Sequence, residues 1–210
     1  RVPVYVQALL GFEELGWKGA AVTAWLRARV GDPAAAQVAE QQALSGGQKL
    51  VGQKAPALSA KRLDGVAGEL DLAKHRGNRP ALVVFAAGWN RASDAALAAA
   101  VRIAQQHGER LAVLGVSLDR AETMPDLAAQ RAQLGVGFPI IGDGIGWDGE
   151  LDDAWQVDRL PTVILVGPDG TVRATELAAA DPDATARAIG EALAPVLGAV
   201  PAPPPADDMP

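Results

Sequence analysis

The sequence predicts an α/β domain, in which a central mixed sheet is flanked by helices. Three continuous apolar runs, 81–86, 111–118 and 160–166, are short and are typical of buried strands. Alanine-rich stretches over 94–107 and 121–134 lie between them and favour helices. Because strands alternate with helices, we expect a sheet that is covered on both faces.

Further elements are predicted at the edges of this sheet. Residues 58–63 have the character of a short edge strand, and 70–75 that of a short helix or turn. Gly-Pro-Asp-Gly at 167–170 turns the third apolar strand into a hairpin with 171–175. Residues 183–197 are predicted to form a closing helix, and the preceding Asp-Pro suits its start.

The chain divides into three predicted parts. Residues 1–47 carry apolar side chains at helical spacing in short stretches separated by Gly and Pro, which predicts a helical segment. Residues 48–198 form the α/β domain, and the proline-rich residues 199–210 are expected to be extended and disordered. The helical segment carries Trp17 and Trp25 among its aromatic side chains; we expect these to dock on the chain's own domain, with a partner surface as the alternative.

Composition excludes several classes of function. The 210-residue chain has a net charge of −6 and no cluster of Lys and Arg, which argues against binding to nucleic acid. No apolar run approaches the ~20 residues of a membrane-spanning helix. The absence of cysteine excludes disulfides, iron–sulfur clusters and thiolate zinc sites. Because the sequence begins at Arg1 without methionine, we expect a mature or trimmed product.

Four motifs occur in the order and spacing of a known family. They are Val-Gly-Gln-Lys-Ala-Pro-Ala-Leu at 51–58, Leu-Asp-Gly at 63–65, Phe-Ala-Ala-Gly-Trp-Asn-Arg-Ala-Ser at 85–93, and Val-Asp-Arg-Leu-Pro-Thr at 157–162. Together they resemble the thioredoxin-like superfamily, in its TlpA/ResA or AhpC/TSA redoxin-like branch. The resemblance covers roughly residues 50–197 and implies a thioredoxin-like fold with a cis peptide bond before Pro161.

The resemblance also implies where thiol chemistry would take place. In that family the third motif carries Trp-Cys-x-x-Cys, and here Asn90 and Ser93 stand at the two cysteine positions. Disulfide exchange requires a thiolate, which neither side chain supplies. Ser93 needs an adjacent base to act as a nucleophile, and His107 lies ~21 Å down the predicted helix. We therefore interpret Ser93, followed by Asp94, as the N-cap of that helix and predict no catalytic residue.

The residues around the missing cysteines are predicted to form a partner-binding surface. The family resemblance implies that Trp89 flanks the site and that Pro161 exposes backbone to which an extended peptide can add as a strand. The predicted surface consists of the loop residues Trp89, Asn90, Arg91 and Ser93 facing Leu160 and Pro161. The alternatives are that Trp89 packs under its own loop and that Arg91 is exposed without a ligand; an anion at Arg91 is less favoured than exposure.

One acidic, glycine-rich stretch, 142–153, has side chains of the type that bind hard cations. Its spacing does not match a calcium-binding loop, because Ile145 and Trp147 occupy ligand positions. Acidic residues are also expected at the start of a helix, here predicted over 150–156, where they interact favourably with the helix dipole. We predict no metal and no cofactor.

The sequence therefore predicts a redox-inactive, thioredoxin-like protein with a binding or structural role and a protein or peptide partner. One alternative is an oxidoreductase whose cysteines have been replaced by engineering. Another is an enzyme that handles glutathione, or uses no thiol, at the helix N-terminus beside Ser93. The TlpA-like resemblance favours a bacterial, extracytoplasmic (periplasmic) location.

Overall fold

The computed structural model describes Trp17 and residues 49–198. The predicted helices within 1–47 and the predicted tail 199–210 lie outside the described residues. The division of the chain into three parts therefore stays a prediction.

Within residues 49–198, strands form one seven-stranded sheet with the spatial order β2-β1-β5-β4-β3-β6-β7. The strands are β1 (Ser59–Arg62), β2 (Glu69–Asp71), β3 (Ala81–Ala86), β4 (Ala112–Ser117), β5 (Ile140–Gly142), β6 (Thr162–Val166) and β7 (Val172–Ala174). The central strands β5, β4 and β3 are parallel to one another, and the outer pairs are antiparallel. The predicted mixed sheet is confirmed.

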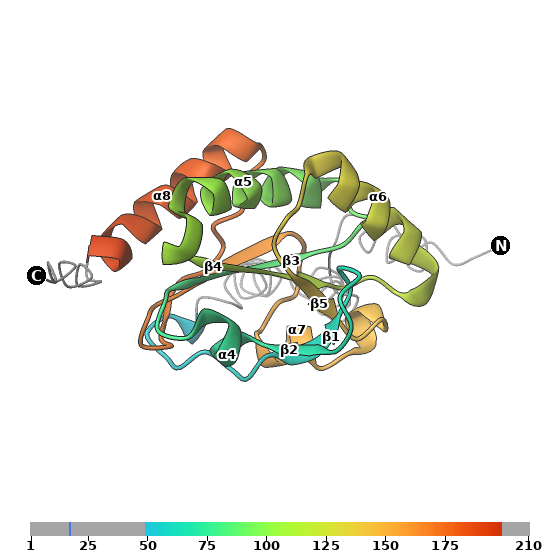
Figure 1. Ribbon diagram of the computed structural model, residues 1–210, viewed down its shortest axis with the longest axis horizontal. Helices are drawn as coiled ribbons and strands as arrows, with labels where there is room; N and C mark the ends of the chain where they lie inside the picture. The colour runs from blue at the N-terminus through green and yellow to red at the C-terminus, as the bar shows by residue number, and fades with distance from the viewer. Residues whose placement is uncertain (1–16, 18–48, 199–210) are drawn as a thin grey trace, which may run out of the picture.

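Helices cover both faces of this sheet, as Figure 1 shows: α5, α6 and α8 lie on one face, and α4 and α7 on the other. They are α4 (Leu72–Arg76), α5 (Ala92–His107), α6 (Met124–Leu134), α7 (Leu151–Ala154) and α8 (Pro182–Gly198). Helices α5 and α6 each connect two parallel strands, which is the usual role of a helix in such a sheet. None of the helices in the described part of the chain is long and apolar enough to span a membrane.

Strand β3 is buried on both faces, and this explains its continuous apolar sequence. Leu82 and Val84 belong to the apolar cluster under α5 and α8. Val83 and Phe85 belong to the cluster on the opposite face, where the Phe85 ring lies 5.9 Å from that of Trp155. The sheet therefore separates two apolar layers, with β3 contributing to each.

The structure differs from the sequence prediction at two short strands. The stretch 70–75, predicted to be a short helix or turn, lies partly in β2, and α4 begins after Asp71, whose carboxylate accepts a hydrogen bond from the Lys74 N–H. Strand β5 was not predicted, because three residues are too few to show a period. Its position is defined by pairing with β4 and β1.

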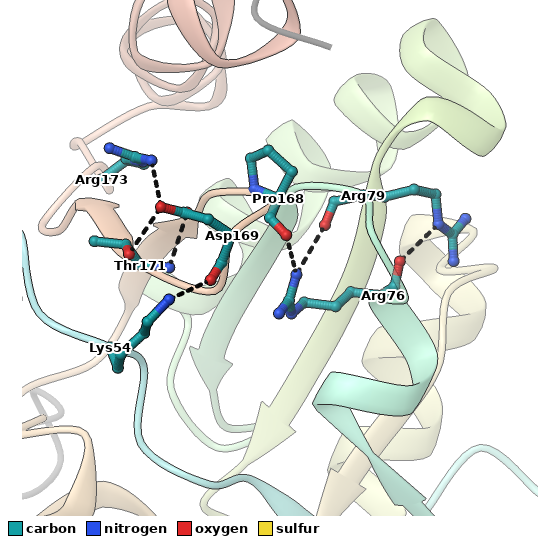
Figure 2. A network of polar contacts seen from close by, with 7 residues as sticks. All are labelled: Lys54, Arg76, Arg79, Pro168, Asp169, Thr171 and Arg173. Atoms are coloured by element: carbon teal, nitrogen blue, oxygen red, sulfur yellow. Dashed lines mark hydrogen bonds and ion pairs between the residues drawn. The ribbon is translucent and has the colours of Figure 1, made fainter. Parts of the chain in front are cut away.

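Side chains from distant segments secure the turn 167–170 of the predicted hairpin. Asp169 accepts hydrogen bonds from the backbone N–H and the hydroxyl of Thr171, which lower the pKa of its carboxyl. The Arg76 guanidinium donates to the Pro168 carbonyl at 2.9 Å, and the Lys54 ammonium donates to the Asp169 carbonyl at 2.6 Å (Figure 2). The Gly-Pro-Asp-Gly turn therefore has a structural role, at the opposite end of β6 from Pro161.

Gly88, just after β3, offers a test of the packing. A Cβ there would lie 2.6 Å from the Leu127 Cα at the start of α6, a backbone contact that no rotamer change relieves. We expect Gly88→Ala to lower the free energy of unfolding by about 1–3 kcal/mol or more in urea denaturation. Gly137→Ala is the matched control, since nothing lies within 4 Å of the added methyl group. Equal stability of the two variants would contradict the close contact.

Candidate functional site

The sheet register brings the two segments of the predicted surface together. Phe85, near the end of β3, pairs with Thr162 at the start of β6 in an antiparallel ladder. The loop that follows β3 and the segment that precedes β6 therefore lie at the same end of the sheet. The Leu160–Pro161 peptide bond in that segment is cis, and Leu160 and Trp89 pack on the same apolar cluster.

Asn90 and Ser93, at the positions of the missing cysteines, are buried and bonded to each other. They are 2% and 0% exposed. The Ser93 hydroxyl donates to Asn90 Oδ1 at 3.3 Å and accepts from the Ala87 N–H at 3.2 Å. Asn90 Oδ1 also accepts from the Ser93 backbone N–H at 3.1 Å. A pair of hydrogen-bonded side chains thus closes the loop without a covalent bond.

The predicted N-cap at Ser93 is wrong. Helix α5 begins at Ala92, and Ser93 lies within its first turn. The side chain that satisfies the Ser93 N–H belongs to Asn90, three residues earlier, as in a capping interaction. The helix therefore starts two residues before the predicted 94.

No described side chain activates Ser93. Its hydroxyl proton points to an amide oxygen, which is not a base. His75 lies in α4, with its Nε2 atom 3.2 Å from the Val113 carbonyl oxygen, and burial lowers the pKa of its imidazole. His107 ends α5, at the far end of that helix from Ser93. The Ser93 N–H is already bonded to Asn90 Oδ1, so it is not a free donor for a bound thiolate.

Asp119, which the sequence analysis did not single out, anchors the start of the loop. Its side chain is fully buried, and both carboxylate oxygens accept from the Gly88 N–H, at 3.1 and 2.9 Å. The Ser117 hydroxyl donates to the same carboxylate at 2.7 Å. Burial raises the pKa of the Asp119 carboxyl against these hydrogen bonds. A carboxylate directly after the apolar run 111–118 was the available sequence signal.

Helix α6 supplies a second restraint through Gln130. Its Nε2 donates to Asp94 Oδ1 at 2.6 Å and to the Ala87 carbonyl at 3.4 Å. The first turn of α5 and the end of β3 are therefore both joined to α6. Together with the Asp119 carboxylate, this contact holds the backbone on both sides of Trp89 and Arg91 in place.

The six predicted surface residues divide into two sets. The side chains of Asn90, Ser93 and Leu160 are buried beneath the surface. Trp89 and Pro161 are partly exposed, and Arg91 is exposed. We call the side chains of Trp89, Arg91 and Pro161, with the backbone of Leu160, the cis-proline surface.

The acidic stretch 142–153 is occupied by local contacts. The Asp143 carboxylate accepts a hydrogen bond from the Ile145 N–H, and its side chain lies against Gly149. Asp148 forms an ion pair with Arg120 at 2.7 Å. The predicted helix 150–156 is shorter, as α7 spans four residues. Within the described residues, no group of three or more His, Cys, Asp or Glu is placed to hold a metal ion.

The fold and this site define a protein of the thioredoxin-like class, with its redox position filled by Asn and Ser. The sequence profile of the AhpC/TSA family matches residues 51–175, and the chain belongs to that family. No curated protein matches it. Because the chain contains no cysteine, it does not carry out Cys-x-x-Cys chemistry.

Solved structures agree with this fold. A thiol-disulfide oxidoreductase from Bacteroides fragilis is 24% identical, covers 59% of this chain and 90% of its own, and has a TM-score of 0.53. The thioredoxin domain of a thiol-disulfide oxidoreductase from Bacteroides vulgatus is 20% identical, with coverages of 67% and 96% and a TM-score of 0.57. A secreted disulfide oxidoreductase from Mycobacterium tuberculosis is 18% identical, with coverages of 64% and 95% and a TM-score of 0.52.

Replacing Asn90 tests the bonded pair. In Asn90→Ala the Ser93 hydroxyl loses its acceptor and the helix loses its capping side chain. We expect the free energy of unfolding in urea to fall by about 1–2 kcal/mol. Arg91→Ala, one residue on and exposed, is the control and should change little. Equal effects from the two substitutions would contradict a structural role for the Asn90 amide.

The buried Asp119 predicts a pH dependence of stability. Its pKa in the folded protein lies above the ordinary value of 3.8, so the folded state binds the proton more tightly than the unfolded state. The stabilisation from this group is present below pH 3.8 and is lost as the pH rises through the raised pKa. In urea denaturation from pH 3.5 to 7, we expect the stability of the native protein relative to Asp119→Asn to fall as the pH rises. A constant difference would contradict the raised pKa.

Proposed function

We propose that this protein is a redox-inactive member of the AhpC/TSA family that binds an extended peptide of a protein partner at the cis-proline surface. The observation that carries the proposal is that the loop after β3 and the cis-Pro161 segment lie together, although Asn90 and Ser93 stand at the two cysteine positions. Asn90 and Ser93 close the loop from within, while Trp89 and Arg91 stay accessible beside Pro161. Binding of a peptide at this surface requires these accessible residues and does not require a thiol.

The backbone at 159–161 supports strand addition. The β6 ladder with β3 begins at Thr162, so no strand within residues 49–198 pairs with the three residues before it. A backbone edge next to a sheet is a template for an incoming extended segment, whose main chain supplies hydrogen bonds. This feature favours a peptide over a small molecule as the ligand.

A pocket beside Pro161 supplies a place for a peptide side chain. Its volume is about 240 Å³, and it is lined by Arg159, Pro161, Thr162, Glu176 and the alanines at 178–180. In strand addition, specificity comes from pockets that take alternate side chains of the added strand. The alanine wall and the Arg159–Glu176 ion pair give this pocket both apolar and charged borders.

Selection from a displayed library of random peptides tests the proposal. We expect enriched peptides to lose about 2 kcal/mol of binding free energy, roughly 30-fold in Kd, in Trp89→Ala, because a partly exposed aromatic side chain is a typical binding anchor. Val66→Ala is the control, since Val66 is 52% exposed in the turn between β1 and β2. Failure to enrich peptides, or equal binding by the two variants, would overturn the proposed surface.

A further inference from the structure

The backbone edge at Pro161 already has an occupant in this structure. Trp17 and Arg159 form an isolated antiparallel β-bridge. Arg159 lies two residues before Pro161. It pairs with Trp17 before the ladder between β3 and β6 begins at Thr162. The Trp17 residue is partly buried there. A residue from the beginning of the chain thus pairs where the proposed peptide would add.

Contacts of the Arg159 side chain and carbonyl fix its position. Its guanidinium pairs with Glu176 at 3.3 Å, and the two side chains are 28% and 20% exposed. The Thr162 hydroxyl donates to the Arg159 carbonyl at 2.8 Å. Because this backbone edge is already held in place, it loses little conformational entropy when a strand pairs with it. This favours association with an extended segment.

The Trp17 backbone and an incoming peptide compete for one edge. In an antiparallel pair, each residue directs its N–H and C=O groups to a single neighbouring strand on that side. A peptide that pairs with Arg159 and continues along Leu160 must therefore take the place of Trp17. Pairing within the chain and binding of a partner are mutually exclusive at this residue.

We propose that Trp17 is an internal ligand, which pairs with the backbone at Arg159, next to the cis-proline surface, in competition with the partner peptide. This inference rests on the proposed function and names the first ligand of that site, Trp17 of the chain itself. Release of Trp17 then precedes partner binding. The apparent affinity for a peptide in trans is reduced by the fraction of molecules in which the edge is free.

A disulfide lock tests the pairing, because the chain contains no other cysteine. Paired residues of an antiparallel bridge have Cα atoms about 4.5–5.5 Å apart, within the range that a disulfide spans. We expect Trp17→Cys/Arg159→Cys to form an intramolecular disulfide on mild oxidation, detected by mass spectrometry. The control Trp17→Cys/Lys74→Cys places the second cysteine on α4 and should not form one. If the first pair fails to form a disulfide, or both pairs form one equally, the inference is overturned.

Competition is measured with a synthetic peptide of residues 12–22 of this chain, labelled for fluorescence anisotropy. Trp17→Pro removes a backbone N–H and fixes φ at the bridged residue, which disfavours strand pairing there, and we expect it to bind this peptide about tenfold more tightly than the native protein. The oxidised double-cysteine protein should not bind it, and reduction should restore binding. Urea denaturation of Trp17→Pro checks that the domain stays folded.

The outcomes separate the inference from the proposed function. If peptides selected from the random library bind equally to the oxidised and reduced double-cysteine proteins, internal competition is wrong and the partner site stands. If the peptide of residues 12–22 binds Trp17→Pro but no library peptide binds any variant, the internal ligand stands and the partner site is wrong. If neither binds to Trp17→Pro or to the reduced protein, both are overturned.

Discussion

The antiparallel pairing of β3 with β6 is the constraint on which the site depends. It places the end of the most deeply buried strand beside the start of β6, with Phe85 opposite Thr162. Everything proposed for the surface follows from this register, because it joins a loop and a cis peptide bond that lie far apart in the sequence. The apolar layers on both sides of β3 stabilise the register, since a slip by one residue would exchange the side chains of the two layers.

The loop after β3 is held by hydrogen bonds from buried side chains. Asp119 bonds the Gly88 N–H, Gln130 bonds Asp94, and Asn90 bonds Ser93. Each contact comes from a buried or nearly buried group, so breaking one leaves a polar atom without water or a partner. These contacts hold the backbone on both sides of Trp89.

The sequence was informative where many residues share one pattern. The apolar run 81–86 predicted β3 because a strand buried on both faces needs no polar alternation, and the four motifs predicted the thioredoxin-like fold. Strand β5 was missed, as three residues show no period, and so was Asp119, whose partner Gly88 is distant in the sequence. The helix start was misplaced because Ser and Asn both cap helices, and only the geometry distinguishes them.

The hydrogen bond between Asn90 and Ser93 has a consequence that a cysteine pair at these positions would not have. A dithiol and its disulfide are two species, and their ratio follows the potential of the surroundings. An amide and a hydroxyl exist in one oxidation state, so this loop has the same covalent structure in reducing and in oxidising surroundings. Oxidants and reductants in the medium therefore leave the shape of this loop unchanged.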